Sequence, residues 1–184
     1  MERKLKIMVS SAVYGFEFQI EQICGLLTDM GYEVINSHIG TVKVHPGHSN
    51  LYNSVEAVKD CDLFFGIIRP YCGTGNIGEK NITFEEMRTA IELNKPYWFV
   101  VHRDVTFARR LSKQITGEIK KTSFFDPLSI EMYNMVIKND EKDIPKRKGN
   151  WAQEFFKIDE IFTYIRTQFG DVDFINSIIT SQKS

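Results

Sequence analysis

Cysteine is scarce in this chain of 184 residues, which has three, Cys24, Cys61 and Cys72, and no two of them form a Cys-x-x-Cys pair. An odd number without close spacing indicates neither a disulfide framework nor a zinc knuckle, and predicts reduced thiols. Long apolar runs are also missing, because the longest, Leu63 to Ile68 and Tyr97 to Val101, are only of strand length. The sequence therefore predicts no membrane span.

An excess of charge of one sign is absent as well. Lys and Arg number 23, Asp and Glu number 24, and the formal net charge is -1. Such a balance gives no broad attraction to nucleic acid or to an anionic membrane, so neither is expected as a partner. The first residues are followed by too short an apolar segment for a signal peptide, which predicts a cytoplasmic protein. The length and an apolar content of 42% suit one soluble folded domain.

Strands and helices are predicted to alternate over the first hundred residues. Short apolar strands are expected at 5–9, 33–35, 63–68 and 97–101, with helices at about 20–30, 50–59 and 83–94. The last two strands are apolar at every position, which is typical of strands that are covered on both faces. This order predicts an α/β fold with a doubly wound parallel sheet of four to five strands, of the flavodoxin-like kind.

The remainder of the chain is expected to be helical, with helices at 107–119, 127–137, 151–168 and 171–180. We therefore predict a flavodoxin-like nucleotide-binding core at 1–104 and a helical extension at 105–184 that packs on the same domain. Aromatic residues in the extension suit packing on the sheet or on a second subunit. A homo-oligomer is thus left open.

Glycine-rich phosphate motifs are missing after the first strand. There is no Gly-x-Gly-x-x-Gly and no Gly-Lys-Ser/Thr, which argues against a dinucleotide-dependent redox enzyme and an NTPase. Ligands of open parallel sheets bind outside the carboxyl ends of the strands. This rule selects as candidates Ser10, Ser11, Tyr14, Arg69, Tyr71, Gly73, Glu86, His102, Arg103 and Asp104.

Several of these candidates have structural alternatives. The Ser10 and Ser11 hydroxyls suit a ribose or phosphate, although Ser10 could simply begin a turn. The Arg69 guanidinium suits a phosphate, with an ion pair to Glu79 or Asp104 as the alternative. His102 could be a general acid or a substrate clamp, and a structural histidine fits the pattern equally well.

Glu86 is the sharpest candidate for chemistry. A carboxylate at the mouth of the sheet could face the anomeric carbon of a nucleoside and act as a nucleophile or stabilise a cationic transition state. The alternative is a capping box, because Thr83 and Glu86 have the spacing in which the carboxylate binds amides of its own helix. Glu85 competes for the catalytic role but is expected on a different part of the helix surface.

A metal site is disfavoured. His45 and His48 flank Pro46 and Gly47, with His38 nearby, but no carboxylate or cysteine groups convincingly with them. We interpret this segment as an ordinary polar loop, and expect no metal and no cofactor.

Three segments together resemble a known family. They are KIMVSS at 6–11, CDLFFGII at 61–68, and ITFEE at 82–86 running on to Ala90 and to Lys95-Pro96. In this order and spacing they resemble the domain of unknown function 4062, over about residues 5–103. That family is similar in turn to nucleoside 2-deoxyribosyltransferases and to TIR domains, which share a flavodoxin-like sheet and break an N-glycosidic bond with a glutamate.

The resemblance implies a function. In the transferases the glutamate precedes an alanine by four residues, and Glu86 with Ala90 matches that register, which selects Glu86 over Glu85. A hydrolase or transferase acting on NAD or a deoxynucleotide is thus implied, with Ser10, Ser11 and Arg69 holding ribose and phosphate and Tyr71 stacking on the base. The alternative is a nucleotide-sensing or self-associating signalling module that does not turn over its ligand and could act in prokaryotic defence. NAD would be a substrate in this scheme, not a cofactor.

Overall fold

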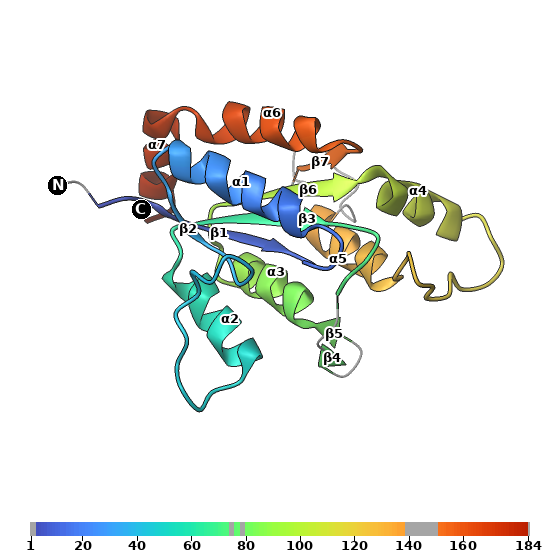
Figure 1. The fold of residues 1–184 in the computed structure, drawn as a ribbon. Helices are drawn as coiled ribbons and strands as arrows, with labels where there is room; N and C mark the ends of the chain where they lie inside the picture. Colours follow the sequence, from blue (N-terminus) through green and yellow to red (C-terminus); the bar gives the residue numbers. More distant parts are fainter. Residues whose placement is uncertain (1–2, 74–75, 78–79, 139–150, 184) are drawn as a thin grey trace.

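The protein is described by a computed structural model that covers residues 3–73, 76–77, 80–138 and 151–183 (Figure 1). Within these ranges, five strands form one parallel sheet in the order β2-β1-β3-β6-β7. The strands are β1 (Lys6–Ser11), β2 (Glu33–Ile35), β3 (Leu63–Ile68), β6 (Tyr97–His102) and β7 (Ala152–Phe155). The predicted α/β fold with a flavodoxin-like parallel sheet is confirmed.

Helices cover both faces of the sheet (Figure 1). One face packs against α1 (Glu17–Asp29), α6 (Ile158–Phe169) and α7 (Val172–Lys183). The other packs against α2 (Asn50–Asp60), α3 (Ile82–Glu92), α4 (Arg103–Ser112) and α5 (Leu128–Ile137). A short antiparallel pair, β4 (Asn76–Ile77) and β5 (Lys80–Asn81), precedes α3. None of the described helices has the length and apolarity that a bilayer span needs.

The central strand β3 explains why the fold is layered on both sides. All six of its residues are buried. Leu63, Phe65 and Ile67 pack in one apolar core, and Phe64 and Ile68 pack in the other. Gly66 leaves room for the ring of Phe99 on β6, because a Cβ at position 66 would stand 2.5 Å from two carbons of that ring. The apolar run in the sequence is therefore a strand packed on both faces, as predicted.

Two predicted helices differ from the structure. The helix expected at 151–168 is wrong over its first part, because Ala152–Phe155 is strand β7 at the edge of the sheet. Only Phe155 is buried in this strand, so it has no continuous apolar run that could have identified it. The helix expected at 107–119 is α4, which begins at Arg103 and ends at Ser112. His102 caps it, and its ring Nδ1 accepts the Asp104 N–H at 3.2 Å.

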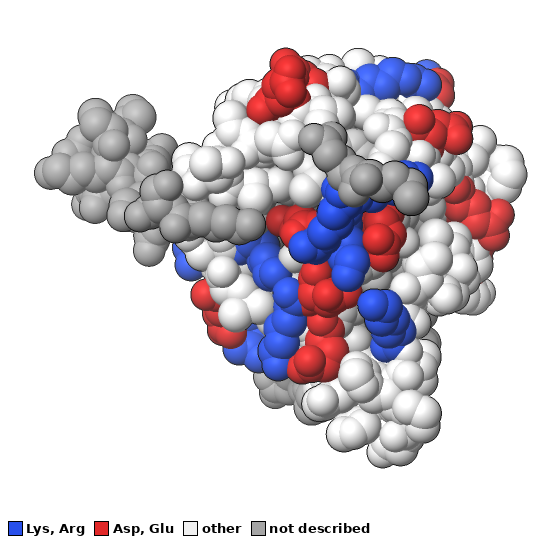
Figure 2. All heavy atoms as spheres, turned by 90° about the vertical axis from the view of Figure 1, so that its left-hand side faces the viewer, with Lys and Arg blue, Asp and Glu red and all other residues white. Residues whose placement is uncertain are grey.

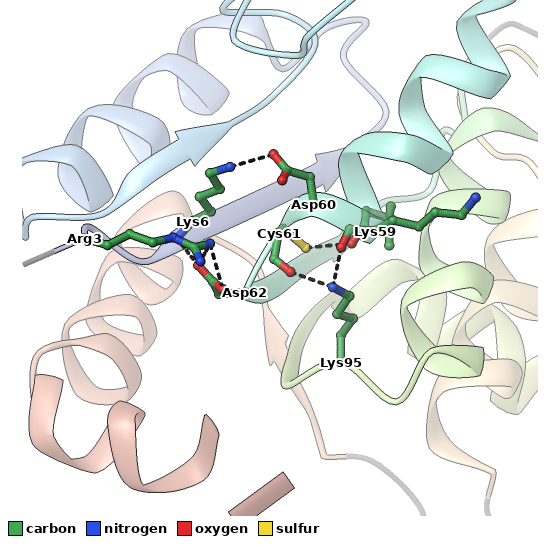
Figure 3. A network of polar contacts seen from close by, with 8 residues as sticks. Arg3, Lys6, Lys59, Asp60, Cys61, Asp62 and Lys95 are labelled. Atoms are coloured by element: carbon green, nitrogen blue, oxygen red, sulfur yellow. Dashed lines mark hydrogen bonds and ion pairs between the residues drawn. The ribbon is translucent and has the colours of Figure 1, made fainter. Parts of the chain in front are cut away.

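The amino ends of the strands are closed by a network of paired charges (Figure 3). Arg3 binds Asp62, and Lys6 Nζ binds Asp60 at 2.7 Å. Lys95 donates to the backbone carbonyls of Lys59 and Cys61, which end α2 and lead into β3. Figure 2 shows this face of the molecule, with positive and negative side chains side by side. The network holds the amino ends of β1, β3 and β6 in place. The candidate residues lie at the opposite, carboxyl ends of the strands.

Candidate functional site

Helix α3 places Glu86 beside the carboxyl end of β1. The helix begins after Asn81, whose side chain accepts the Phe84 N–H at 2.8 Å. The expected capping box of Thr83 and Glu86 is therefore wrong, because the cap lies two residues before Thr83 and leaves Glu86 one turn inside the helix. Asn81 was overlooked because Thr83 with Glu86 matches the capping-box spacing in the sequence.

The Glu86 carboxylate is bound by side chains of other elements. Its Oε2 accepts a hydrogen bond from the Ser10 hydroxyl on β1 at 2.5 Å. Glu86 is only 6% exposed and Ser10 only 1%. Burial raises the pKa of Glu86 above its ordinary value, while the Ser10 hydroxyl and that of Ser54 on α2 favour the charged form. A carboxylate with a raised pKa, held by a neighbouring strand instead of its own backbone, is typical of catalytic groups.

A cavity of about 190 Å³ lies against Glu86. It opens at the carboxyl ends of β1 and β2, and Glu86 and Thr83 of α3 form one side of it. The order of the sheet reverses at the neighbouring pair of strands, β1 and β3. Of the candidates predicted from the sequence, it is lined by Ser11, Tyr14, Gly73 and Glu86. We call it the Glu86 cavity. Ser10 lies directly behind it through its bond to the carboxylate.

Two residues at this cavity were missed by the sequence analysis. Asn36 and Ser37 line it from the loop that follows β2. The Asn36 side chain is buried, and its amide donates to the Val9 carbonyl at 2.8 Å, which ties the end of β2 to β1. The carboxyl-end rule applied to the second strand would have found both residues. Ser54 could not have been found, because its approach to Glu86 depends on the packing of α2 against α3.

Three further candidates lie on a second cavity, of about 590 Å³, at the carboxyl ends of β3, β6 and β7, whereas Arg103 and Asp104 line neither cavity. Arg69, Tyr71 and His102 line it. Arg69 does not make the expected ion pair with Asp104; its guanidinium donates to the carbonyls of Ala12, Tyr14 and Gly15. Glu79, the other expected partner, lies outside the described residues.

The two cavities share one wall. The rings of Tyr14 and Tyr71 pack with their centroids 5.5 Å apart, and one lines each cavity. Arg69 holds the backbone of the β1–α1 loop through three carbonyls and stacks on Phe16 at 4.3 Å. This loop, with Gly15 at a φ of +68°, is thereby fixed over the end of the sheet.

The histidine-rich loop shows aromatic packing. The His48 ring stacks on Tyr52 with centroids 4.1 Å apart, and His45 lies edge-on to the same ring. Among the described residues, no three histidine, cysteine or acidic side chains stand close enough together to hold a metal ion. The rings of His45 and His48 are thus arranged around a tyrosine, whereas the His38 Nε2 lies 3.1 Å from a carboxylate oxygen of Glu21.

A family model for a domain of unknown function (DUF4062) matches residues 6–168. The chain belongs to the DUF4062 family. The match spans all five strands and runs into α6, so both cavities lie within the DUF4062 region. The segments KIMVSS, CDLFFGII and ITFEE that resemble this family lie in β1, β3 and α3 of the structure.

Solved structures with a similar fold are distant in sequence. A Clostridium botulinum CMP N-glycosidase, BcmB, matches with 13% identity and a TM-score of 0.49, over 88% of this chain and 98% of that one. A conserved protein from Enterococcus faecalis V583 matches with 12% identity and a TM-score of 0.47, over 90% of this chain and 99% of that one. No curated protein matches the DUF4062 chain.

Proposed function

We propose that this DUF4062 protein cleaves the N-glycosidic bond of a nucleotide, either NAD or a deoxynucleotide, with Glu86 as the reacting carboxylate. The observation that carries this proposal is the position of Glu86. Its carboxylate does not cap its own helix, is bound by Ser10 of a neighbouring strand, and lies against a cavity at the carboxyl ends of β1 and β2. The register of Glu86 with Ala90, which resembles that of deoxyribosyltransferases, supports the same choice.

The proposed chemistry uses the ionised carboxylate. Either an oxygen of Glu86 forms a bond to the anomeric carbon, or its charge stabilises the oxocarbenium ion. In both cases the bond to the base breaks, and the base leaves with the bonding electrons. Water, or a hydroxyl or base nitrogen of an acceptor, then attacks the anomeric carbon and, in the first case, breaks its bond to Glu86, whose carboxylate is restored. The proton that the attacking group loses goes to the departing base or to solvent. The Ser10 and Ser54 hydroxyls favour the charged form of Glu86 against the cost of burial.

The cavity walls suit a sugar. The Ser11 side chain, the Asn36 and Ser37 loop and the Thr83 hydroxyl provide polar groups around the carboxylate. At about 190 Å³ the cavity is smaller than the roughly 300–1,000 Å³ of most ligand pockets. A ribose fits this volume, and the base would then lie outside, near the exposed ring of Tyr14 at the rim.

The second candidate function is a nucleotide-sensing or self-associating module without turnover. The small volume of the Glu86 cavity and the short hydrogen bond to Ser10 favour it, because both restrain the carboxylate before any ligand arrives. In this case a nucleotide would bind and the N-glycosidic bond would stay intact. The two functions differ in one observable, the release of free base.

A matched pair of variants tests the proposal. The purified protein is incubated with NAD, deoxynucleoside monophosphates and ribonucleoside monophosphates, and free base is quantified by chromatography. The assay is repeated with Glu86→Gln and with Glu85→Gln. Glu85 is the neighbouring carboxylate and is bound to Arg88 on the helix surface, so its substitution controls for charge.

We expect base release by the unchanged protein and by Glu85→Gln, and its loss in Glu86→Gln. Equal release by all three proteins would remove Glu86 from the proposed role. Tight nucleotide binding without release of base from any substrate would favour the sensing module.

A further inference from the structure

The second cavity has no role in the chemistry proposed for Glu86. It is formed where β3, β6 and β7 end, and it holds about 590 Å³, which is within the range of small-molecule sites. Its walls include Arg69, Tyr71, His102, Phe124, Phe156 and Lys157. Neither Glu86 nor Ser11 contributes to it. We call it the Arg69 cavity.

Arg69 brings a partly satisfied guanidinium to this cavity. An arginine has five N–H donors, and Arg69 uses three of them in hydrogen bonds to carbonyls of the β1–α1 loop, its only hydrogen bonds to the described residues. No described carboxylate forms an ion pair with it, and burial lowers its pKa below the usual range, although the group stays charged. Two donors and a positive charge are therefore available to an anion.

His102 adds a donor of defined tautomer. Its Nδ1 accepts the Asp104 N–H, so the proton of the neutral ring is on Nε2. Burial lowers the pKa of His102, which keeps the ring neutral near pH 7. The structure shows no described partner for Nε2, and the ring lines the cavity. His102 thus offers one N–H donor from the end of β6.

Lys157 provides a second positive charge, from the residue before α6. The ammonium group makes no ion pair with any described residue. Asp159 is the one acidic side chain among the described residues that line the cavity, and Glu160 on the same helix is occupied by the backbone amides of Phe156 and Lys157. Arg69, Lys157 and His102 therefore line the cavity together with Asp159, and the Asp104 carboxylate lies 3.4 Å from the His102 Nδ1 without lining the cavity.

Aromatic rings form much of the remaining wall. Phe124 is 76% exposed, and its side chain lines the cavity. Phe156 is half-exposed and has the Arg103 guanidinium 3.5 Å from its ring centroid. Tyr71 closes the side toward the Glu86 cavity. Rings of this kind stack on nucleobases.

We propose that the Arg69 cavity is a second nucleotide site, which binds a nucleoside 5′-monophosphate with its phosphate at Arg69, His102 and Lys157. The base lies among Tyr71, Phe124 and Phe156. Phosphate is favoured as the anionic group because it accepts several hydrogen bonds from a guanidinium and an ammonium at once. This site is independent of the cleavage proposed for Glu86, because it shares no side chain with that chemistry.

Calorimetric titration tests the site directly. The four ribonucleoside 5′-monophosphates are titrated into the Glu86→Gln protein, which lacks the carboxylate proposed for cleavage and retains every residue of the Arg69 cavity. The matching nucleosides, without phosphate, are titrated in parallel. Lys157→Gln and Phe124→Ala are then introduced one at a time, since both side chains are exposed and neither supports the core. Lys113→Gln, an exposed lysine that lines neither cavity, is the control.

We expect at least one monophosphate to bind, with a dissociation constant raised about tenfold or more by Lys157→Gln and by removal of the phosphate. Phe124→Ala should weaken nucleotide and nucleoside alike, and Lys113→Gln should change neither. Binding that is unaffected by Lys157→Gln and Phe124→Ala, equal binding of nucleoside and nucleotide, or no binding of any monophosphate would overturn the proposal. Base release by the unchanged protein is a separate measurement, so either proposal can fail alone.

Discussion

Removal of the Ser10 hydroxyl tests how Glu86 is held. Ser10→Ala deletes a 2.5 Å hydrogen bond between two groups that are 1% and 6% exposed, so water cannot readily replace the donor. A hydrogen bond to a charged group contributes about 1.5–3 kcal/mol, and one between neutral groups about 1 kcal/mol. The loss of stability should therefore depend on whether Glu86 is ionised.

The sign of this dependence follows from the raised pKa of Glu86. Below the pKa of an unfolded glutamic acid, the carboxyl is protonated in both states, and Ser10→Ala should cost about 1 kcal/mol. As the pH rises through the folded-state pKa, the native carboxylate loses a donor that favours its charged form. The cost should then grow to about 2–3 kcal/mol.

Urea unfolding of the unchanged protein and Ser10→Ala, from about pH 4 to pH 9, measures the two limits. Ser129→Ala is the control, because Ser129 is also fully buried and its hydroxyl donates to the backbone carbonyl of Asp126 at 2.7 Å, which does not titrate. Its cost should be the same at every pH. A cost for Ser10→Ala that is equally flat would refute the account of the Glu86 carboxylate.

Four further outcomes are expected. The unchanged protein should lose stability relative to Glu86→Gln as the pH rises from the unfolded pKa of Glu86 to its raised folded pKa, by up to about 1.4 kcal/mol in the free energy of unfolding per pH unit. A difference between their urea midpoints that stays constant across this window would contradict the burial argument. Gly66→Ala should lower the melting temperature by the equivalent of about 1–3 kcal/mol, because its Cβ meets the Phe99 ring, and an unchanged melting temperature would show that the ring moves freely. Arg69→Gln should increase proteolysis of the β1–α1 loop, whereas protection equal to that of the parent would show that the three carbonyl bonds do not hold it. Burial raises the pKa of Cys72 to about 12, so a thiol reagent at pH 8 should react with it only after unfolding, and rapid native labelling would contradict its placement.

Much of the fold could be predicted from the sequence because its strands carry strong local signals. The strand at 63–68 is apolar at every position, and its neighbours alternate with helices of clear periodicity. Strand β7 lacked such a signal. It lies at the sheet edge with one buried residue in four, and its pairing with β6 is a contact across about fifty residues of sequence. Local patterns do not report contacts of that range.

The sequence predicted one site at the carboxyl ends of the strands, and the structure distributes its residues over two cavities. The carboxyl-end rule grouped residues that follow β1, β3 and β6 into one site, because it identifies the end of the sheet at which ligands bind and not the separate cavities at that end. The side chains of Tyr14 and Tyr71 separate two cavities at the carboxyl ends of the strands, and Arg69 lines the cavity that does not contain Glu86. Which hydroxyl reaches Glu86 depends on how α2 and α3 pack on β1, which no motif in the sequence encodes.

The measurement that tests the central claim most directly is the single-turnover rate of base release at saturating nucleotide, for the unchanged protein and for Glu86→Gln. If Glu86 reacts with the sugar or stabilises its cation, the variant should be slower by about 10²-fold or more while its nucleotide affinity stays similar. Equal rates in the two proteins would contradict the account, because a carboxamide in that position can neither form the bond nor supply the charge.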